Sequence, residues 1–228
     1  MAADTELQRL TREWFSRAST LEYSYHFEWM GRPVIQFPQD LAAMQELIWK
    51  VRPGLIIETG IARGGSLVFY ASMLELLGGD GRVLGVDIEI RSHNRAAIEA
   101  HPMFQRITML EGSSIDPAII RRVHEHAEGR RPVMVVLDSN HTHDHVLAEL
   151  CAYGDLVTRG SYLVVFDTVI ECMPDGFFKD RPWGRDNNPA TAVRAFLGAN
   201  KRFEADAAID AKLQITVAPG GFLKCVQD

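Results

Sequence analysis

The sequence is poor in cysteine and has no long apolar run, and both absences exclude classes of protein. Three cysteines, Cys151, Cys172 and Cys225, are widely spaced among the 228 residues and form no C-x-x-C pair. A disulfide framework or a zinc knuckle is therefore not expected. No run approaches the roughly eighteen apolar residues of a membrane-spanning helix, and no basic segment followed by an apolar core opens the chain. We expect a cytoplasmic protein without a membrane partner.

An excess of positive charge is also lacking. Lysine and arginine number 24 against 30 aspartates and glutamates, which gives a formal net charge of -6. Because nucleic-acid binding depends on neutralising phosphates, this balance argues against a nucleic-acid partner. The length suits one α/β domain with a full core. We expect residues 1–52 to form an N-terminal helical cap, residues 53–228 to form the main domain, and the substrate to be a small molecule.

The chain also lacks the dinucleotide-binding pattern G-x-G-x-x-G. Residues 55–66 instead read L-I-I-E-T-G-I-A-R-G-G-S. Residues 55–57 form an apolar run that is typical of a central parallel strand, and Gly60, Gly64 and Gly65 allow a tight turn before a helix. The pattern predicts a nucleotide-binding loop that carries a carboxylate, Glu58, at the strand end.

Glu58 discriminates between cofactors. A carboxylate repels a pyrophosphate but suits a cationic ligand. S-adenosylmethionine carries a sulfonium and an amino group, so this loop favours it over NAD. A nicotinamide-dependent oxidoreductase and a non-catalytic S-adenosylmethionine-binding protein are the alternatives. The loop residues expected to bind the cofactor are Glu58, Gly60, Arg63, Gly64, Gly65 and Ser66.

Apolar runs alternate with amphipathic segments along most of the chain. This alternation predicts a Rossmann-like α/β fold, with a mostly parallel seven-stranded sheet covered by helices on both faces. An amphipathic helix is expected over 4–21, and a second helix is expected to start with Asp40 as its N-cap. The expected strands are 55–59, 82–87, 106–110, 132–138, 161–167, 203–208 and 212–218, and a final extended segment is expected over 222–226.

Polar residues at the strand ends are candidates for the site, because ligands of open parallel sheets bind beyond the carboxyl ends of the strands. We expect Asp87 to accept hydrogen bonds from ribose hydroxyls and Ser113 to lie beside the adenine; turn or cap roles are the alternatives. Asp138 and Asp167 end neighbouring strands and are expected to share a Mg²⁺ ion. The alternative is that both merely cap loops. Asp138 is also expected to border the cofactor.

His141 follows Asp138 by three residues and is the candidate general base, because imidazole titrates near neutral pH. Its spacing from His145 would also suit a zinc site on one helical face, and a turn-stabilising role is a further alternative. Residues 169–188 and the N-terminal aromatic segment are expected to close over the acceptor, or else simply to pack against the sheet. The residues expected at the acceptor are Tyr23, Trp29, Phe166, Thr168, Phe178 and Trp183.

Several segments together resemble one known family, the cephalosporin hydroxylase or rhamnosyl O-methyltransferase family. They are residues 29–40 (WMGRPVIQFPQD), 58–66 (ETGIARGGS), 137–141 (LDSNH), 160–168 (GSYLVVFDT) and 219–224 (PGGFLK). The resemblance spans about 22–226 and implies a class I methyltransferase fold. It further implies an S-adenosylmethionine-dependent O-methyltransferase of sugars or natural products, related to metal-dependent macrolide-sugar methyltransferases, which forms homo-oligomers and holds Mg²⁺.

The resemblance places the metal-binding aspartates on Asp138 and Asp167 and the histidine base on His141. Phe166 departs from the pattern, because the family usually has a glutamate there as a further metal ligand. The departure leaves three possibilities open: weaker Mg²⁺ binding, a site completed by Thr168 and water, or a site without metal in which His141 acts alone.

Overall fold

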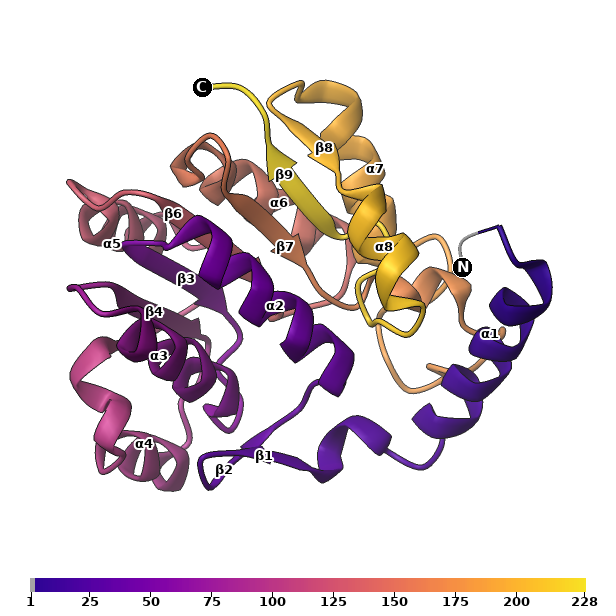
Figure 1. The fold of residues 1–228 in the computed structure, drawn as a ribbon, viewed down its shortest axis with the longest axis horizontal. Helices are drawn as coiled ribbons and strands as arrows, with labels where there is room; N and C mark the ends of the chain where they lie inside the picture. Colours follow the sequence, from indigo (N-terminus) through magenta and orange to yellow (C-terminus); the bar gives the residue numbers. More distant parts are fainter. Residues whose placement is uncertain (1–2) are drawn as a thin grey trace.

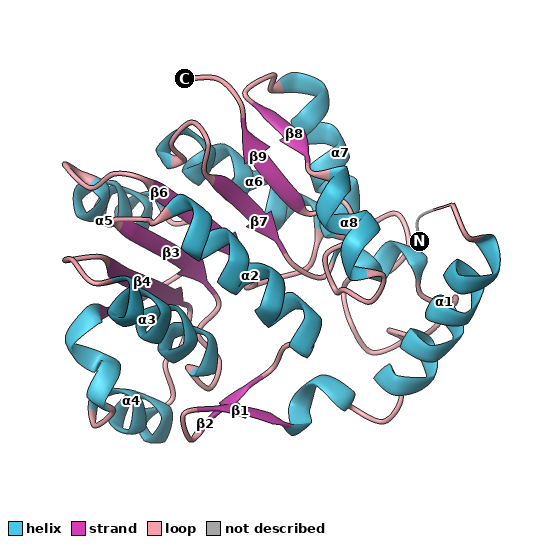
Figure 2. Cartoon of the chain, viewed as in Figure 1, coloured by secondary structure: helices cyan, strands magenta, loops and turns pink. Residues whose placement is uncertain are grey.

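The computed structural model describes residues 3–228, so Met1 and Ala2 of the expected cap lie outside the described residues. A seven-stranded sheet runs through the molecule in the order β5-β4-β3-β6-β7-β9-β8 (Figures 1 and 2). Its strands are β3 (Leu55–Thr59), β4 (Arg82–Asp87), β5 (Ile107–Glu111), β6 (Val133–Leu137), β7 (Tyr162–Val165), β8 (Phe203–Ala205) and β9 (Phe222–Cys225). Strands β3 to β7 pair in parallel, and β8 and β9 pair antiparallel. The sequence-based prediction of fold class is confirmed.

Apolar side chains form a core on each face of the sheet, since β3 and β6 are buried throughout. One face packs against α2 (Pro38–Val51), α3 (Gly65–Leu77) and α4 (Ser92–Glu99). The other face packs against α5 (Pro117–Ala127), α6 (His143–Tyr153) and α7 (Pro189–Ala199). Every helix within residues 3–228 is too short or too polar to span a lipid bilayer.

The N-terminal segment reaches the site from one side. It comprises α1 (Thr5–Ser19), the 3₁₀ turn η1 (Tyr23–His26) and the antiparallel pair β1 (Phe27–Trp29) and β2 (Arg32–Val34). Phe15 of α1 stacks on Phe37, with ring centroids 4.8 Å apart. In Figure 1, α1 lies at the edge of the molecule opposite α4.

The expectation that Asp40 caps α2 is wrong. The helix begins two residues earlier, at Pro38, and its N-cap residue Phe37 offers no side-chain hydrogen bond. Proline at the first helical position needs no N–H partner and starts the helix by itself. The Asp40 side chain is fully buried and bonds instead with Thr216 and Val217, 176 and 177 residues away.

The expected strand at 212–218 is also wrong. The strand expected over 203–208 ends earlier, at Ala205, and the next residue, Asp206, caps a helix, α8 (Ala207–Leu213), by accepting hydrogen bonds from the backbone of Ala208 and Ile209. A loop follows, and the seventh strand of the sheet is β9. The error arose because alternation of apolar residues over a short stretch does not separate a strand from a helix.

Candidate active site

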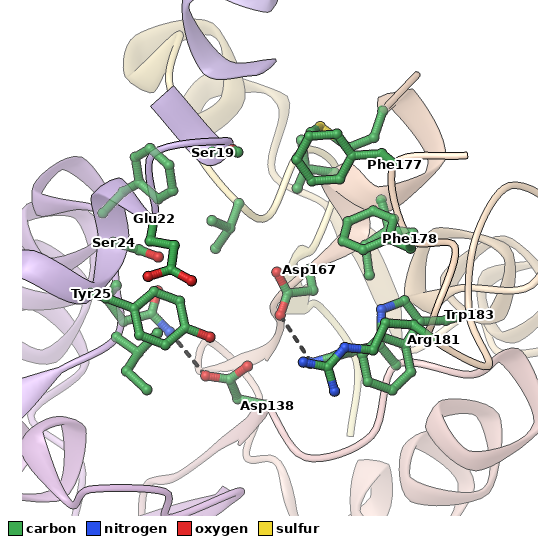
Figure 3. Close-up of a pocket in the computed structure, with 18 of the residues that line it drawn as sticks. Ser19, Glu22, Ser24, Tyr25, Asp138, Asp167, Phe177, Phe178, Arg181 and Trp183 are labelled. Atoms are coloured by element: carbon green, nitrogen blue, oxygen red, sulfur yellow. Dashed lines mark hydrogen bonds and ion pairs between the residues drawn. The ribbon is translucent and has the colours of Figure 1, made fainter. Parts of the chain in front are cut away.

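Three potential ligand groups meet at the carboxyl ends of β6 and β7. One ligand atom each of Asp138, His141 and Asp167 lies within 4.8 Å of the others. Asp138 directly follows β6, and Asp167 comes two residues after β7. Figure 3 shows the two carboxylates facing each other on the floor of a pocket, with Tyr25 on one side and Arg181 and Trp183 on the other. The structure therefore brings together the three residues that the sequence placed at the reacting centre.

Asp138 is held by Gln36. The Gln36 side-chain amide donates a 3.0 Å hydrogen bond to Oδ2 of Asp138. Burial raises the pKa of Asp138 well above its usual value, and the nearby charges of Asp167 and Glu58 raise it further. A cation between the two aspartates would oppose this effect, because it would favour the charged form of both carboxyls.

Asp167 has an unusual backbone conformation. Its φ of 56° and ψ of 19° place it in the left-handed region, which costs a non-glycine residue about 1–2 kcal/mol. The residues that follow are anchored to the loop before β9. Thr168 Oγ1 donates to the carbonyl of Pro219 at 2.9 Å, and the N–H of Val169 donates to the carbonyl of Val217 at 3.1 Å. These bonds hold the carboxylate of Asp167 at the floor of the pocket.

His141 is fixed by two neighbours. Its Nε2 lies 3.3 Å from Oδ2 of Asp167, and its ring meets Trp183 edge to face at a centroid distance of 4.8 Å. The guanidinium of Arg181 lies over the same tryptophan, 5.4 Å from the ring centroid. A carboxylate beside an imidazole fixes the orientation of the ring. This is an arrangement suited to a general base.

The pocket above these residues is a cavity of about 390 Å³, which we call the large cavity. Its floor contains Gln36, Asp138, His141 and Asp167. Its walls come from α1 and the turn after it on one side and from the loop 173–183 on the other (Figure 3). The apolar and aromatic part of the wall consists of Phe15, Tyr25, Ile35, Phe37, Ala62, Val169, Ile170, Met173, Phe177, Phe178, Trp183 and Val217.

The glycine loop lies beside the floor and leaves no room for side chains. A Cβ on Gly60, whose φ is 93°, would lie 2.0 Å from the carbonyl oxygen of Asp138. A Cβ on Gly65 would lie 2.2 Å from the carbonyl oxygen of Pro33. Glycine at these positions lets the loop pack against the segments that carry Asp138 and Gln36. Gly60, Arg63, Gly64, Gly65 and Ser66 line a narrow recess next to Asp138.

Glu58 lies behind this loop and is fully buried. Its Oε2 accepts a 2.6 Å hydrogen bond from the Ser66 hydroxyl, while Oε1 has no hydrogen-bond partner among residues 3–228. Burial raises its pKa from 4.5 to about 8, against the opposing effect of the Ser66 hydrogen bond. Glu58 therefore acts on the loop through Ser66, from the end of β3.

Glu58 should make the fold less stable as pH rises. The folded protein keeps the proton up to a pH of about 8, whereas an unfolded glutamate loses it near 4.5. The free energy of unfolding should therefore fall by about 1.4 kcal/mol per pH unit between these values, from this group alone. In Glu58→Gln this contribution to the pH dependence of the unfolding free energy should vanish, and only the contribution of other buried carboxyls should remain. Urea unfolding at several pH values measures it, with exposed Glu28→Gln as control. Equal slopes in wild type and Glu58→Gln would contradict the assignment.

Asp87 binds the other end of the loop. Its Oδ2 accepts hydrogen bonds from the N–H groups of Ile61 at 2.7 Å and Ala62 at 3.1 Å. A second cavity, of about 170 Å³, opens beside it and is called the small cavity below. The small cavity is lined by Gly60, Val86, Asp87, Ile88, Ser113, Ser114, Ser139, Asn140 and His145. The structure thus places Asp87 and Ser113 together in the small cavity, which shares Ser139 with the large one.

His145 and Glu149 were missed as members of this region. Nε2 of His145 lies 3.1 Å from the Ser114 hydroxyl and 3.5 Å from the fully buried Glu149 carboxylate. Their i, i+4 spacing on α6 was a signal for this pair, but nothing in the sequence showed that this face of α6 is buried. His145 faces the small cavity and His141 the large one, so the structure does not join them in one zinc site.

The residues expected at the acceptor separate into two groups. Phe178 and Trp183 line the large cavity. Tyr23 packs on Trp14, Phe27 and Phe37, and Trp29 packs on Phe69 and donates to Ser72. Phe166 and Thr168 are 2% and 1% exposed, Phe166 within the core and Thr168 bonded to the loop before β9. These last four therefore support the walls and floor from behind.

Known proteins resemble this chain in sequence and in fold. The family model described as Rhamnosyl O-methyltransferase/CmcI matches residues 21–226. The chain belongs to this family. A rhamnosyl O-methyltransferase of Mycobacterium tuberculosis (strain ATCC 25618 / H37Rv) is 33% identical over 202 residues, which cover 86% of this chain and 76% of the relative. The chain is thus an S-adenosylmethionine-dependent O-methyltransferase.

Two solved structures share the fold. CmcI with Mg and SAM superposes with a TM-score of 0.62 at 20% identity, covering 89% of this chain and 78% of that one. An O-methyltransferase from Bacillus cereus in complex with SAH superposes with a TM-score of 0.58 at 16% identity, covering 100% and 98% of the two chains. The class I methyltransferase fold that the sequence predicted is therefore confirmed.

Proposed function

We propose that this methyltransferase transfers the methyl group of S-adenosylmethionine to a hydroxyl group of a sugar or natural-product small molecule, with His141 as general base. The observation that carries the proposal is the position of the His141 imidazole. It lies on the floor of the large cavity, 3.3 Å from Asp167, with the glycine loop on the neighbouring side of Asp138. A hydroxyl group that reaches this floor is within range of both the base and the methyl donor.

The reaction needs mainly positioning. A new bond forms between the acceptor oxygen and the methyl carbon while the bond from that carbon to the sulfonium sulfur breaks. The hydroxyl proton passes to the His141 imidazole, which the contact with the Asp167 carboxylate orients. The products are the methyl ether and S-adenosylhomocysteine. The Trp183 ring and the aromatic wall keep water from the reacting oxygen.

The donor set at the floor fits a divalent cation. Asp138 and Asp167 supply two carboxylates within reach of each other, and Mg²⁺ typically takes one or two carboxylates and completes its shell with water or substrate oxygens. Phe166 lies in the core and supplies no ligand, so the site has one carboxylate fewer than the family pattern. When bound, Mg²⁺ would lower the pKa of the acceptor hydroxyl and orient its oxygen.

The cofactor is proposed to lie along the glycine loop. Asp87 would hold the ribose hydroxyls and Ser113 would lie beside the adenine, since both line the small cavity. Glu58, at the end of β3, would shape the methionine end of the loop through its contact with Ser66. The loop residues of the proposed site are Glu58, Gly60, Arg63, Gly64, Gly65 and Ser66, with Asp138 at its border.

The acceptor is proposed to enter between the N-terminal segment and the loop 173–183. Phe178 and Trp183 offer flat apolar surfaces to a sugar ring, and relatives named rhamnosyl O-methyltransferase make rhamnosyl glycosides the first class to test. Within the same proposal, residues 1–52 act as the cap and residues 53–228 as the S-adenosylmethionine-binding domain. We also propose a homo-oligomer that works in the cytoplasm.

Methyl transfer and its dependence on metal can be tested together. Labelled S-adenosylmethionine and a panel of rhamnosyl and other glycosides should yield a methylated product in the presence of Mg²⁺. EDTA should lower the rate at least about tenfold, and Asp138→Asn should lower it similarly without EDTA. Asp144→Asn, which changes an exposed aspartate on α6, should keep the wild-type rate. Full activity in EDTA would contradict the metal, and failure with every glycoside would contradict the acceptor class.

A further inference from the structure

One short segment before and within α2 contacts both sides of the carboxylate pair. Gln36 donates directly to Asp138. Four residues later, Asp40 receives hydrogen bonds from the Thr216 hydroxyl at 2.5 Å and from the N–H of Val217 at 2.9 Å. Gln36 is 4% exposed and Asp40 is 0% exposed, so water does not compete for these bonds. Apart from the bond between Gln36 and Asp138, neither side chain contacts a group that takes part in the proposed reaction.

The loop that Asp40 holds is the one that anchors Asp167. Thr216 Oγ1, besides donating to Asp40, accepts a 2.9 Å hydrogen bond from the N–H of Ala218, which shapes the loop at this point. The carbonyl of Val217 then accepts from the N–H of Val169, and the carbonyl of Pro219 accepts from Thr168 Oγ1. Thr168 and Val169 directly follow Asp167. A connected series of hydrogen bonds therefore runs from Asp40 to the residues next to Asp167.

Asp167 depends on such support because its backbone lies in the left-handed region, which a non-glycine residue leaves when its surroundings permit. The Asp167 charge also raises the pKa of Asp40, after the larger effect of burial, so the two groups are close enough to interact. Displacement of the Thr216–Pro219 loop would free Thr168 and Val169 and let the Asp167 carboxylate turn away from Asp138.

We propose that Gln36 and Asp40 are positioning residues that together set the separation of the Asp138 and Asp167 carboxylates. Gln36 fixes Asp138 directly, and Asp40 fixes Asp167 through the Thr216–Pro219 loop. The inference rests on the proposed function in so far as that separation matters for a cation and an acceptor hydroxyl. Groups that orient ligands in this way typically contribute a factor of about 10–100 to metal affinity.

The test uses Mn²⁺ alone as the probe, because its free form is measured by electron paramagnetic resonance. Asp40→Ala and Gln36→Leu should each weaken Mn²⁺ binding about tenfold or more, while Asp40→Asn, which can still accept from Val217, should stay within about threefold of wild type. Affinity for S-adenosylmethionine, measured by calorimetry, should remain unchanged in the two Asp40 variants, because Asp40 does not line the recess beside the glycine loop, whereas Gln36 does. A purely structural defect would instead lower both affinities together or none.

Thr216→Val and Thr158→Val form a matched pair. Both replace a hydroxyl by a methyl group of similar size, and both hydroxyls accept a backbone hydrogen bond, from Ala218 at 2.9 Å and from Val133 at 3.0 Å respectively. Thr158 precedes β7 and bonds to the amino end of β6, away from the site. Thr216→Val should weaken Mn²⁺ binding and Thr158→Val should not. This pair also serves if Asp40→Ala fails to fold.

Crystal structures of Thr216→Val and wild type complete the test. An altered position of the Asp167 carboxylate relative to Asp138 would support the positioning role, and an unchanged separation together with unchanged Mn²⁺ affinity would overturn it. If wild type itself binds no Mn²⁺, the metal of the proposed function fails, and the carboxylate separation in the two crystal structures alone decides the positioning role.

Discussion

Replacing Gly60 by alanine should abolish S-adenosylmethionine binding and destabilise the fold, whereas the same replacement at Gly129 should leave binding intact. Both glycines have positive φ, 93° at Gly60 and 71° at Gly129. The left-handed conformation costs alanine about 1–2 kcal/mol at either position. At Gly60 the new Cβ would also lie 2.0 Å from the carbonyl oxygen of Asp138, whereas at Gly129 nothing lies within 4 Å.

The extra effect at Gly60 comes from backbone that cannot easily move. Its own N–H donates to the carbonyl of Val86 at 2.8 Å, and the N–H of Asp138 donates to the carbonyl of Thr59 at 2.9 Å. Relieving the overlap must separate β3 from the start of the β6–α6 loop, which adds about 1–3 kcal/mol and shifts the proposed cofactor groove. Urea unfolding and calorimetric titration with S-adenosylmethionine measure the two effects. Equal affinity in Gly60→Ala and Gly129→Ala would rule out the loop as the cofactor site.

The glycine loop was predictable from sequence because its signals are local. An apolar run, a polar strand end and closely spaced glycines lie within residues 55–66. The strand has the predicted bounds, Leu55–Thr59, and the helix predicted after the turn is present as Gly65–Leu77. The role of Asp40 was not predictable, because its partners lie 176 and 177 residues away. An aspartate near the start of a helix can cap the helix or bond to a distant segment, and the sequence around it is the same in both cases.

In the candidate site, too, the position along the chain was predictable and the direction of each side chain was not. The carboxyl-end rule placed Asp138 and Asp167 on one edge of the sheet, and β6 and β7 are neighbours there. The rule does not say on which face each side chain lies. Phe166 and Asp167 are adjacent in an extended segment that turns sharply at Asp167, so their side chains diverge, one into the core and one into the cavity. Tyr23 and Trp29 pack against the core instead of lining the cavity. The sequence does not show this, because aromatic side chains serve in packing as readily as in binding.

The second large effect is expected at His141. Once an acceptor has been identified, kcat of His141→Ala should be lower than that of wild type by about a hundredfold or more, which is the usual contribution of a general base. Affinity for S-adenosylmethionine should change little, because the side chain lines the large cavity rather than the small one. Turnover with labelled methyl donor and calorimetric titration give the two numbers on the same preparation.

His143→Ala is the matched control for this prediction. His143 lies two residues further along, at the start of α6, and its Nδ1 lies 2.7 Å from the Thr191 hydroxyl on α7. Loss of that contact affects helix packing without reaching Asp167. If both variants lose turnover equally, the effect of His141 belongs to the fold of the β6–α6 loop. A third outcome is that only His141→Ala loses turnover while EDTA has no effect on wild type. His141 would then accept the proton without help from a metal, and the absence of a carboxylate at Phe166 would be explained because the site needs no further metal ligand.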